Sequence, residues 1–154
     1  MHTHLKEGQS APDFDLADGD GPRHRLGNYR GQKVLLYFYP RDDTPGCTLE
    51  AVSFARSMDQ YLAQGITVLG VSTDTPQSHA KFATKFSLPF PLLADTDGSV
   101  TRAYGVAAYP DSAETRARRV TFLIDEHGTI EKIWDPVSAP THNEDVLSYL
   151  SKLV

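Results

Sequence analysis

The residues best suited to chemistry in this chain surround its single cysteine, Cys47. The segment Tyr37-Phe-Tyr-Pro-Arg-Asp-Asp-Thr-Pro-Gly-Cys-Thr-Leu-Glu50 leaves an apolar run and enters a predicted helix. Thr44 is placed to cap that helix, with Pro45 at its first position, so the cysteine falls in the first turn. Free backbone N–H groups there favour an anion over a neutral thiol, and the thiolate is the reactive form of cysteine. The pattern predicts a nucleophilic thiol.

The neighbours of Cys47 help to decide whether this lone cysteine is a buried core residue or a functional thiol. An unpaired intracellular cysteine is most often a small buried hydrophobe, a role that needs only apolar surroundings. Here a turn-forming Thr-Pro-Gly stretch leads into the cysteine, and its charged flank consists of Arg41, Asp42, Asp43 and Glu50. These polar surroundings favour a functional thiol over a core residue.

Other chemical motifs are weak or absent. The histidines are scattered, and no pair has the helical spacing of metal ligands: His2, His4, His24, His79, His127 and His142. The chain has no G-x-S-x-G elbow, no P-loop and no G-x-G-x-x-G motif. A Cys–His hydrolase would need a base beside the thiol, and no histidine flanks Cys47. We therefore expect no metal site.

Composition restricts the class of protein. The 154 residues suit one domain, residues 1–154, and 40% apolar with 23% charged residues is typical of a globular protein. Fifteen basic and 20 acidic residues give a net charge of −5, which argues against a nucleic-acid partner or an anionic membrane surface. One cysteine excludes an intrachain disulfide and a cysteine-cluster zinc site. We expect a cytoplasmic protein, because the chain shows no signal-peptide region and no apolar run that could span a bilayer.

Two apolar runs on either side of the cysteine predict the strands that position it. Lys33–Tyr39, ended by Pro40, and Ile66–Val71 have the continuous apolar character of strands buried on both faces. Apolar residues recur at helical spacing over Pro45–Ala63, and Gly65 ends that helix. Two buried strands joined by a helix form a parallel βαβ unit. The cysteine then lies at the carboxyl end of a strand, where open α/β sheets place their sites.

The remaining elements complete a mixed central sheet flanked by helices. In chain order they are a strand at Phe14–Ala17 with a hairpin turn at Asp18–Pro22, a helix from Thr75-Pro76 to Phe86, a strand at Phe90–Ala94, a short helix at Ser99–Tyr104, and strands at Val120–Ile124 and Ile130–Trp134 joined by a turn at Glu126–Gly128. Thr141 and Glu144 form a predicted capping box for a last helix, whose apolar face is Val146, Leu147, Leu150 and Leu153. This order predicts an α/β protein with a thioredoxin-like fold and an N-terminal β extension.

The residues around Cys47 resemble the active-site motif of the peroxiredoxins, Pro40-x-x-x-Thr44-x-x-Cys47. Three further segments resemble peroxiredoxin signatures in the same order along the chain: Ala11-Pro-Asp-Phe14, Gly70-Val-Ser-Thr-Asp74 and Arg119-x-Thr-Phe-Leu-Ile-Asp125. The run Asp-Asp-Thr-Pro-Gly-Cys-Thr-x-Glu is similar to the branch of bacterioferritin comigratory protein and PrxQ. The resemblance covers nearly the whole chain.

The resemblance implies a role for each motif residue. Cys47 would attack a peroxide oxygen and become a sulfenic acid. Thr44 would offer its hydroxyl to the peroxide and Pro40 would shield the thiolate from water. Arg119 would hold the thiolate and stabilise developing negative charge, with Glu50 as its supporting partner. The structural alternatives are a capping threonine, a proline that ends the strand, a surface arginine and an exposed helix carboxylate. No metal, haem or flavin cofactor is implied.

One departure from the family pattern concerns the second thiol. Many members of this branch carry a resolving cysteine five residues after the first, and this chain has Val52 there and no other cysteine. The resemblance then implies a one-cysteine peroxidase of hydrogen peroxide and organic hydroperoxides. Its sulfenic acid would be reduced by an external thiol, from thioredoxin, glutaredoxin or a low-molecular-weight thiol. Without a resolving thiol, further oxidation to sulfinic acid is a hazard.

Two other functions stay open at this point. A thioredoxin-fold sensor or binding protein would have its cysteine oxidised and reported to a partner without sustained turnover, and the missing resolving cysteine is compatible with it. A structural domain would be indifferent to Cys47→Ser. The presence of Thr44 and Arg119 favours the enzyme. The family resemblance implies a monomer or a homodimer.

Overall fold

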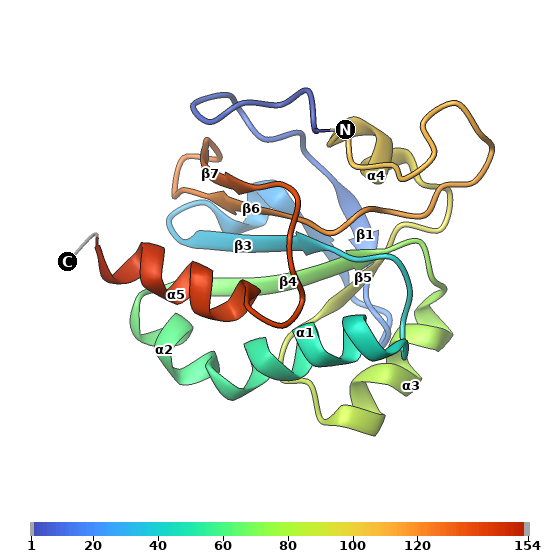
Figure 1. Ribbon diagram of the computed structural model, residues 1–154, viewed down its shortest axis with the longest axis horizontal. Helices are drawn as coiled ribbons and strands as arrows, with labels where there is room; N and C mark the ends of the chain where they lie inside the picture. The colour runs from blue at the N-terminus through green and yellow to red at the C-terminus, as the bar shows by residue number, and fades with distance from the viewer. Residues whose placement is uncertain (1, 153–154) are drawn as a thin grey trace.

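A five-stranded mixed sheet lies at the centre of the chain (Figure 1), which a computed structural model describes over residues 2–152. The strands are β1 (Asp15–Ala17), β2 (Arg23–Arg25), β3 (Lys33–Phe38), β4 (Ile66–Ser72), β5 (Leu92–Ala94), β6 (Val120–Ile124) and β7 (Ile130–Trp134). The helices are the 3₁₀ turn η1 (Leu26–Tyr29), α1 (Pro45–Arg56), α2 (Met58–Ala63), α3 (Pro76–Phe86), α4 (Ser99–Ala103) and α5 (His142–Ser151).

The strand order is β5-β4-β3-β6-β7, with β3 in the middle. β3 pairs with β4, and β4 with β5, in parallel, as βαβ units require. β6 and β7 form the antiparallel hairpin beside β3. This is the thioredoxin-like arrangement that the sequence predicts, and it puts the carboxyl end of β3 directly before the cysteine helix.

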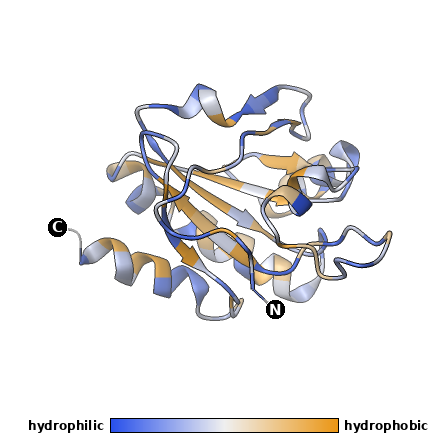
Figure 2. Cartoon of the chain, turned by 90° about the horizontal axis from the view of Figure 1, so that it is seen from above, coloured by the Kyte–Doolittle hydropathy of each residue, from blue (hydrophilic) through white to orange (hydrophobic). Residues whose placement is uncertain are grey.

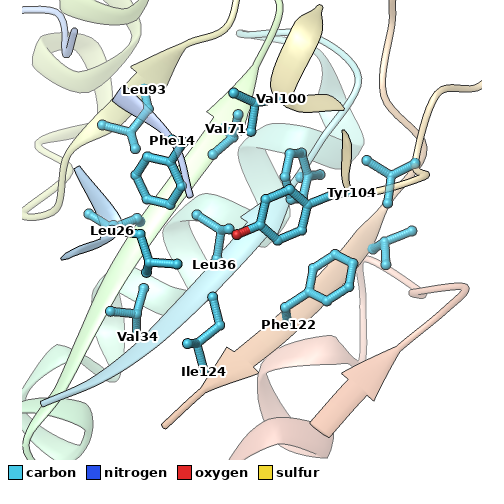
Figure 3. Close-up of a cluster of buried hydrophobic side chains, with 14 of the residues drawn as sticks. Phe14, Leu26, Val34, Leu36, Val71, Leu93, Val100, Tyr104, Phe122 and Ile124 are labelled. Carbon is cyan, nitrogen blue, oxygen red and sulfur yellow. The ribbon is translucent and has the colours of Figure 1, made fainter. Parts of the chain in front are cut away.

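Alternate residues of β3 face two different cores, as the strand period requires. Leu35 and Tyr37 face a cluster formed with the inner sides of α1, α2, α3 and α5. Val34, Leu36 and Phe38 face a cluster formed with the N-terminal segment and α4 (Figure 3). After Lys33, every residue of β3 is buried and all are apolar or aromatic, and Figure 2 shows the apolar strands inside more hydrophilic surface segments.

The predicted N-terminal extension is the β1–β2 hairpin, and it packs against the β5 edge of the sheet. Asp18 in its turn forms an isolated antiparallel bridge with Leu93. Gly19 lies directly against α3: a β-carbon at this residue would sit 2.7 Å from the backbone nitrogen of Ala80. The β1–β2 hairpin therefore packs against the backbone of α3.

Several local predictions were wrong. The helix expected over Pro45–Ala63 breaks at Ser57, whose φ of −105° and ψ of 10° end α1 before α2 begins. The capping box at Thr141 does not form, because the Thr141 hydroxyl makes no cap hydrogen bond to the backbone of α5. The remaining predicted strands and helices are present, with ends that shift by up to two residues. Leu153, predicted on the face of the last helix, lies outside the described residues.

None of the helices within residues 2–152 combines the length and the apolar character that crossing a bilayer requires.

Candidate active site

Cys47 is the third residue of α1, immediately after the loop that follows β3. Pro45 occupies the first helical position, where its missing N–H costs nothing. The cysteine side chain is only 1% exposed and belongs to the core cluster that also holds Tyr37 and Phe54. The thiol therefore lies at a helix N-terminus and is buried in the apolar core.

Thr44 has the backbone conformation of the N-cap residue of α1, but its side chain makes no capping hydrogen bond. Its φ of −97° and ψ of 156° are extended, and its carbonyl accepts the N–H of Thr48 at 2.8 Å. The predicted side-chain cap is wrong, because the Thr44 hydroxyl donates to the carbonyl of Arg41 at 3.0 Å. With its proton committed to that carbonyl, the hydroxyl oxygen has lone pairs left to accept a hydrogen bond.

Arg119 directly precedes β6 and reaches the first turns of α1. Its Nη1 lies 3.3 Å from Oε1 of Glu50. A β-carbon at Gly46 would sit 2.6 Å from its Nη2, so the guanidinium lies against the residue just before Cys47. The neighbouring Arg118 instead binds Asp135 at 2.7 Å. Of these two adjacent arginines, Arg119 is the one beside the cysteine helix.

Glu50 is buried, which rules out the exposed helix carboxylate considered above. The residue is 1% exposed, and its Oε2 has no hydrogen-bond partner among the described residues. Burial raises the pKa of Glu50 to about 7, against the charge and hydrogen bond of Arg119, which lower it. The ion pair of Glu50 and Arg119 is therefore sensitive to pH near neutrality.

Tyr37 belongs to the same surroundings, although the sequence marked it only as a core aromatic. Its hydroxyl is buried without a hydrogen-bond partner among residues 2–152. Burial above all, and then negative charge on Glu50 and Cys47, raise the pKa of Tyr37 well above its usual value, while Arg119 acts in the opposite direction. The hydroxyl thus stays neutral and shares the electrostatic environment of the thiol.

A polar cluster beside the loop was also missed by the sequence analysis, which left His79 unassigned. The ligand-type atoms of Asp42, Asp74 and His79 lie within 4.8 Å of one another, close enough to suit a metal ion. They are engaged with protein groups: Nδ1 of His79 lies 2.7 Å from Oδ2 of Asp42, and Asp74 accepts the Ser72 hydroxyl at 2.6 Å. The cluster is best described as a hydrogen-bond network. Only the position of Asp42 inside the motif could have pointed to it.

Pro40 lies between the end of β3 and the loop and is half-buried. The preceding Tyr39 still donates its N–H to the carbonyl of Val71 at 3.1 Å, although β3 itself ends at Phe38. The shielding role of Pro40 stays a prediction. Three of the predicted residues, Cys47, Glu50 and Arg119, lie together at the start of α1. The other two, Pro40 and Thr44, lie in the loop before that helix.

Comparison with known proteins gives concordant matches. Residues 8–133 match the model of the AhpC/TSA family. Peroxiredoxin Bcp of Escherichia coli is 40% identical over 151 residues, which cover 96% of this chain and 97% of that protein. The crystal structure of peroxidoxin BcpB from Mycobacterium tuberculosis superposes with a TM-score of 0.91 at 31% identity, covering 98% of this chain and 99% of the other.

A second similar structure comes from a protein that is described in connection with a reaction. It is the bacterioferritin comigratory protein of Xanthomonas campestris, described in connection with alkyl peroxide reduction and with trapped intermediate and ligand complexes. Its TM-score is 0.87 at 30% identity, covering 96% of this chain and 98% of the other.

Proposed function

This chain belongs to the AhpC/TSA family of peroxiredoxins and is a thiol-dependent peroxidase, and we propose that Cys47 is the residue that reacts with the peroxide. The observation that carries the proposal is the position of the sole cysteine in the first turn of α1, with the Arg119 guanidinium against the preceding Gly46. A positive group and free N–H groups at a helix N-terminus both stabilise a thiolate.

In the oxidative step the Cys47 thiolate attacks the distal oxygen of a hydroperoxide, ROOH. A sulfur–oxygen bond forms and the oxygen–oxygen bond breaks, so that sulfur loses two electrons and becomes a sulfenic acid. The leaving RO⁻ takes a proton and departs as an alcohol, or as water when the substrate is hydrogen peroxide. Both hydrogen peroxide and organic hydroperoxides are proposed substrates.

The surrounding residues support this displacement by orientation and charge. The Thr44 oxygen accepts the hydrogen bond of the peroxide O–H, since its own proton is committed to Arg41. Arg119 stabilises the negative charge that develops on the leaving oxygen. Glu50 holds the guanidinium in place through the contact at 3.3 Å. Pro40 limits the access of water to the thiolate.

The reductive step needs thiols from outside the chain, since Cys47 is its only cysteine. One thiol R′SH condenses with the sulfenic acid to give a mixed disulfide and water. A second thiol then releases Cys47 and R′S–SR′, which restores the two electrons. We propose thioredoxin, glutaredoxin or a low-molecular-weight thiol as the source, and a cytoplasmic location where such thiols are maintained. A monomer or homodimer suffices, because both partners of the Arg119–Glu50 pair come from one chain.

The test is consumption of hydrogen peroxide and of cumene hydroperoxide by the pure protein, with and without dithiothreitol. Sustained turnover only with thiol, abolished in Cys47→Ser, is the expected result. The matched control is Ser53→Ala, which alters a half-buried side chain of α1 that donates a hydrogen bond to the Leu49 carbonyl. Unchanged consumption in Cys47→Ser refutes the assignment. A single stoichiometric oxidation that thiol does not reverse would support the sensor instead.

A further inference from the structure

The two residues between Arg41 and Thr44 are held by α3, although the motif leaves them unspecified. Asp42 is buried and its carboxylate receives three side-chain contacts: the Tyr39 hydroxyl at 2.5 Å, the Ser78 hydroxyl at 2.7 Å and Nδ1 of His79 at 2.7 Å. Ser78 and His79 are the third and fourth residues of α3. A buried carboxylate with this many partners is strongly localised.

His79 is oriented from both sides of its ring. Its Nε2 lies 3.0 Å from the carbonyl of Leu93, which can only accept, so this nitrogen carries a proton. Its Nδ1 faces Oδ2 of Asp42, and the side chain is fully buried. The ring therefore ties the loop to the backbone just inside β5, an element of the rigid sheet.

The next residue, Asp43, is held as well. It has a φ of 57°, an uncommon conformation for a residue with a β-carbon, and one that persists only when the surroundings impose it. Lys85, also on α3, binds its carboxylate at 2.8 and 3.1 Å. This pair is exposed and contributes little by itself, so the buried contacts of Asp42 bear the main part of the restraint.

We propose that His79 is a positioning residue for the peroxidase reaction, acting through Asp42 on Thr44. The proposal rests on the proposed function. The backbone beside Asp42 connects the two residues, because the Thr44 hydroxyl donates a hydrogen bond to the Arg41 carbonyl at 3.0 Å. A shift of Asp42 moves that carbonyl, turns the hydroxyl and loosens the first turn of α1. Reactions that depend on alignment lose rate steeply when the reacting groups are misplaced.

Two substitutions of His79 separate positioning from general stability. In His79→Asn the side-chain amide nitrogen can take the place of Nδ1 and donate to Asp42, whereas in His79→Gln it takes the place of Nε2 and reaches Leu93 instead. The measurements are the rate constants of Cys47 with hydrogen peroxide and with iodoacetamide, at a temperature where circular dichroism shows both variants folded. Lys81→Met, an exposed residue of the same helix, is the matched control.

We expect His79→Gln to react with peroxide at least about 10-fold more slowly than wild type, and with iodoacetamide faster, because a loosened loop exposes sulfur while losing alignment. His79→Asn should recover most of the peroxide rate, and Lys81→Met should match wild type. Equal peroxide rates in the two His79 variants overturn the proposal, as do peroxide and iodoacetamide rates that change by the same factor. If His79→Gln does not fold, Ser78→Ala, which removes one donor to Asp42, takes its place with the same expectation.

The same measurements distinguish a failure of the proposed peroxidase function from a failure of the positioning role of His79. Wild-type protein that consumes no peroxide with thiol contradicts the proposed function. Wild-type turnover together with an unaffected His79→Gln contradicts only the positioning role of His79.

Discussion

The guanidinium of Arg119 occupies the space that a side chain at Gly46 would need, with Nη2 only 2.6 Å from the place of a β-carbon. Glycine at this position lets the arginine approach the backbone next to the reactive cysteine. The arginine is in turn held by a buried carboxylate, Glu50, on the next turn of α1. A side chain at residue 46 would therefore collide with the Arg119 guanidinium.

Gly46→Ala should displace the Arg119 guanidinium and slow the reaction with hydrogen peroxide. We expect a loss of about 10-fold, smaller than the roughly 100-fold loss in Arg119→Ala, because a flexible arginine can partly adjust. Stopped-flow measurement of peroxide reduction checks this. Gly27→Ala is the matched control, since a β-carbon there meets no atom within 4 Å. A Gly46→Ala rate equal to wild type would show that close approach of Arg119 is dispensable.

Glu50→Gln should change how stability depends on pH. The folded-state pKa of Glu50 is about 7, above the ordinary 4.5, so its ionisation disfavours folding. Wild type therefore loses stability from this group as the pH rises from about 4.5 through 7, by roughly 3 kcal/mol in total. Relative to wild type, Glu50→Gln should gain that amount over the same range.

Urea unfolding at a series of pH values tests the Glu50 prediction. Glu126→Gln, a change at an exposed glutamate, supplies the baseline. A constant difference in unfolding free energy between Glu50→Gln and wild type, from pH 4.5 to pH 8, contradicts the raised pKa.

His142 should make the protein labile in acid. Burial lowers the pKa of His142 from 6.5 to about 4, so the ring is neutral in the folded state at neutral pH. The unfolded chain takes up a proton below 6.5, and stability is lost as the pH falls from there to about 4, by roughly 3 kcal/mol. His142→Gln, which can still reach the Thr121 hydroxyl that Nε2 contacts at 2.7 Å, should lack this loss.

Acid unfolding followed by circular dichroism measures the effect of His142. The exposed His127 provides the comparison, and His127→Gln should follow the wild-type curve. If His142→Gln follows it too, the buried histidine is not the source of acid lability.

Excess peroxide without thiol should carry Cys47 beyond the sulfenic acid. The chain has no second cysteine to trap that intermediate, so a further peroxide oxidises it to sulfinic acid. Peptide mass spectrometry should locate two added oxygen atoms on Cys47, and dithiothreitol present throughout exposure to a limited amount of peroxide should prevent their addition. A cysteine peptide that stays fully reduced would argue against an accessible thiolate.

Sequence patterns predicted the central strands well because their apolar runs admit few other structures. β6 and β7 have the predicted ends, and the cysteine helix begins where Pro45 predicts. The break at Ser57 was not predictable from nearby residues. Its hydroxyl accepts a hydrogen bond from Asn143 on α5 at 2.9 Å, a contact between residues 86 positions apart.

The side-chain partners of the site were harder to predict than its backbone. Thr44 and Thr141 both have N-cap positions, yet neither hydroxyl caps its helix, because each has another oxygen within reach. The contact of Asp42 with His79 joins positions 37 residues apart. Such choices depend on how β5 and α3 pack, which local propensity does not contain.

Burial of the Cys47 side chain, 1% exposed, makes the two half-reactions of the cycle kinetically unlike. A hydroperoxide is small enough to reach the buried sulfur with little movement of the chain, so we expect oxidation to rise in proportion to its concentration. A reducing thiol must reach the same sulfur along the line of the bond it breaks, which requires the first turn of α1 to open. We expect the reductive rate to saturate with thiol at the rate of that opening, so that an enlarged thiol pool gives no faster turnover beyond the plateau.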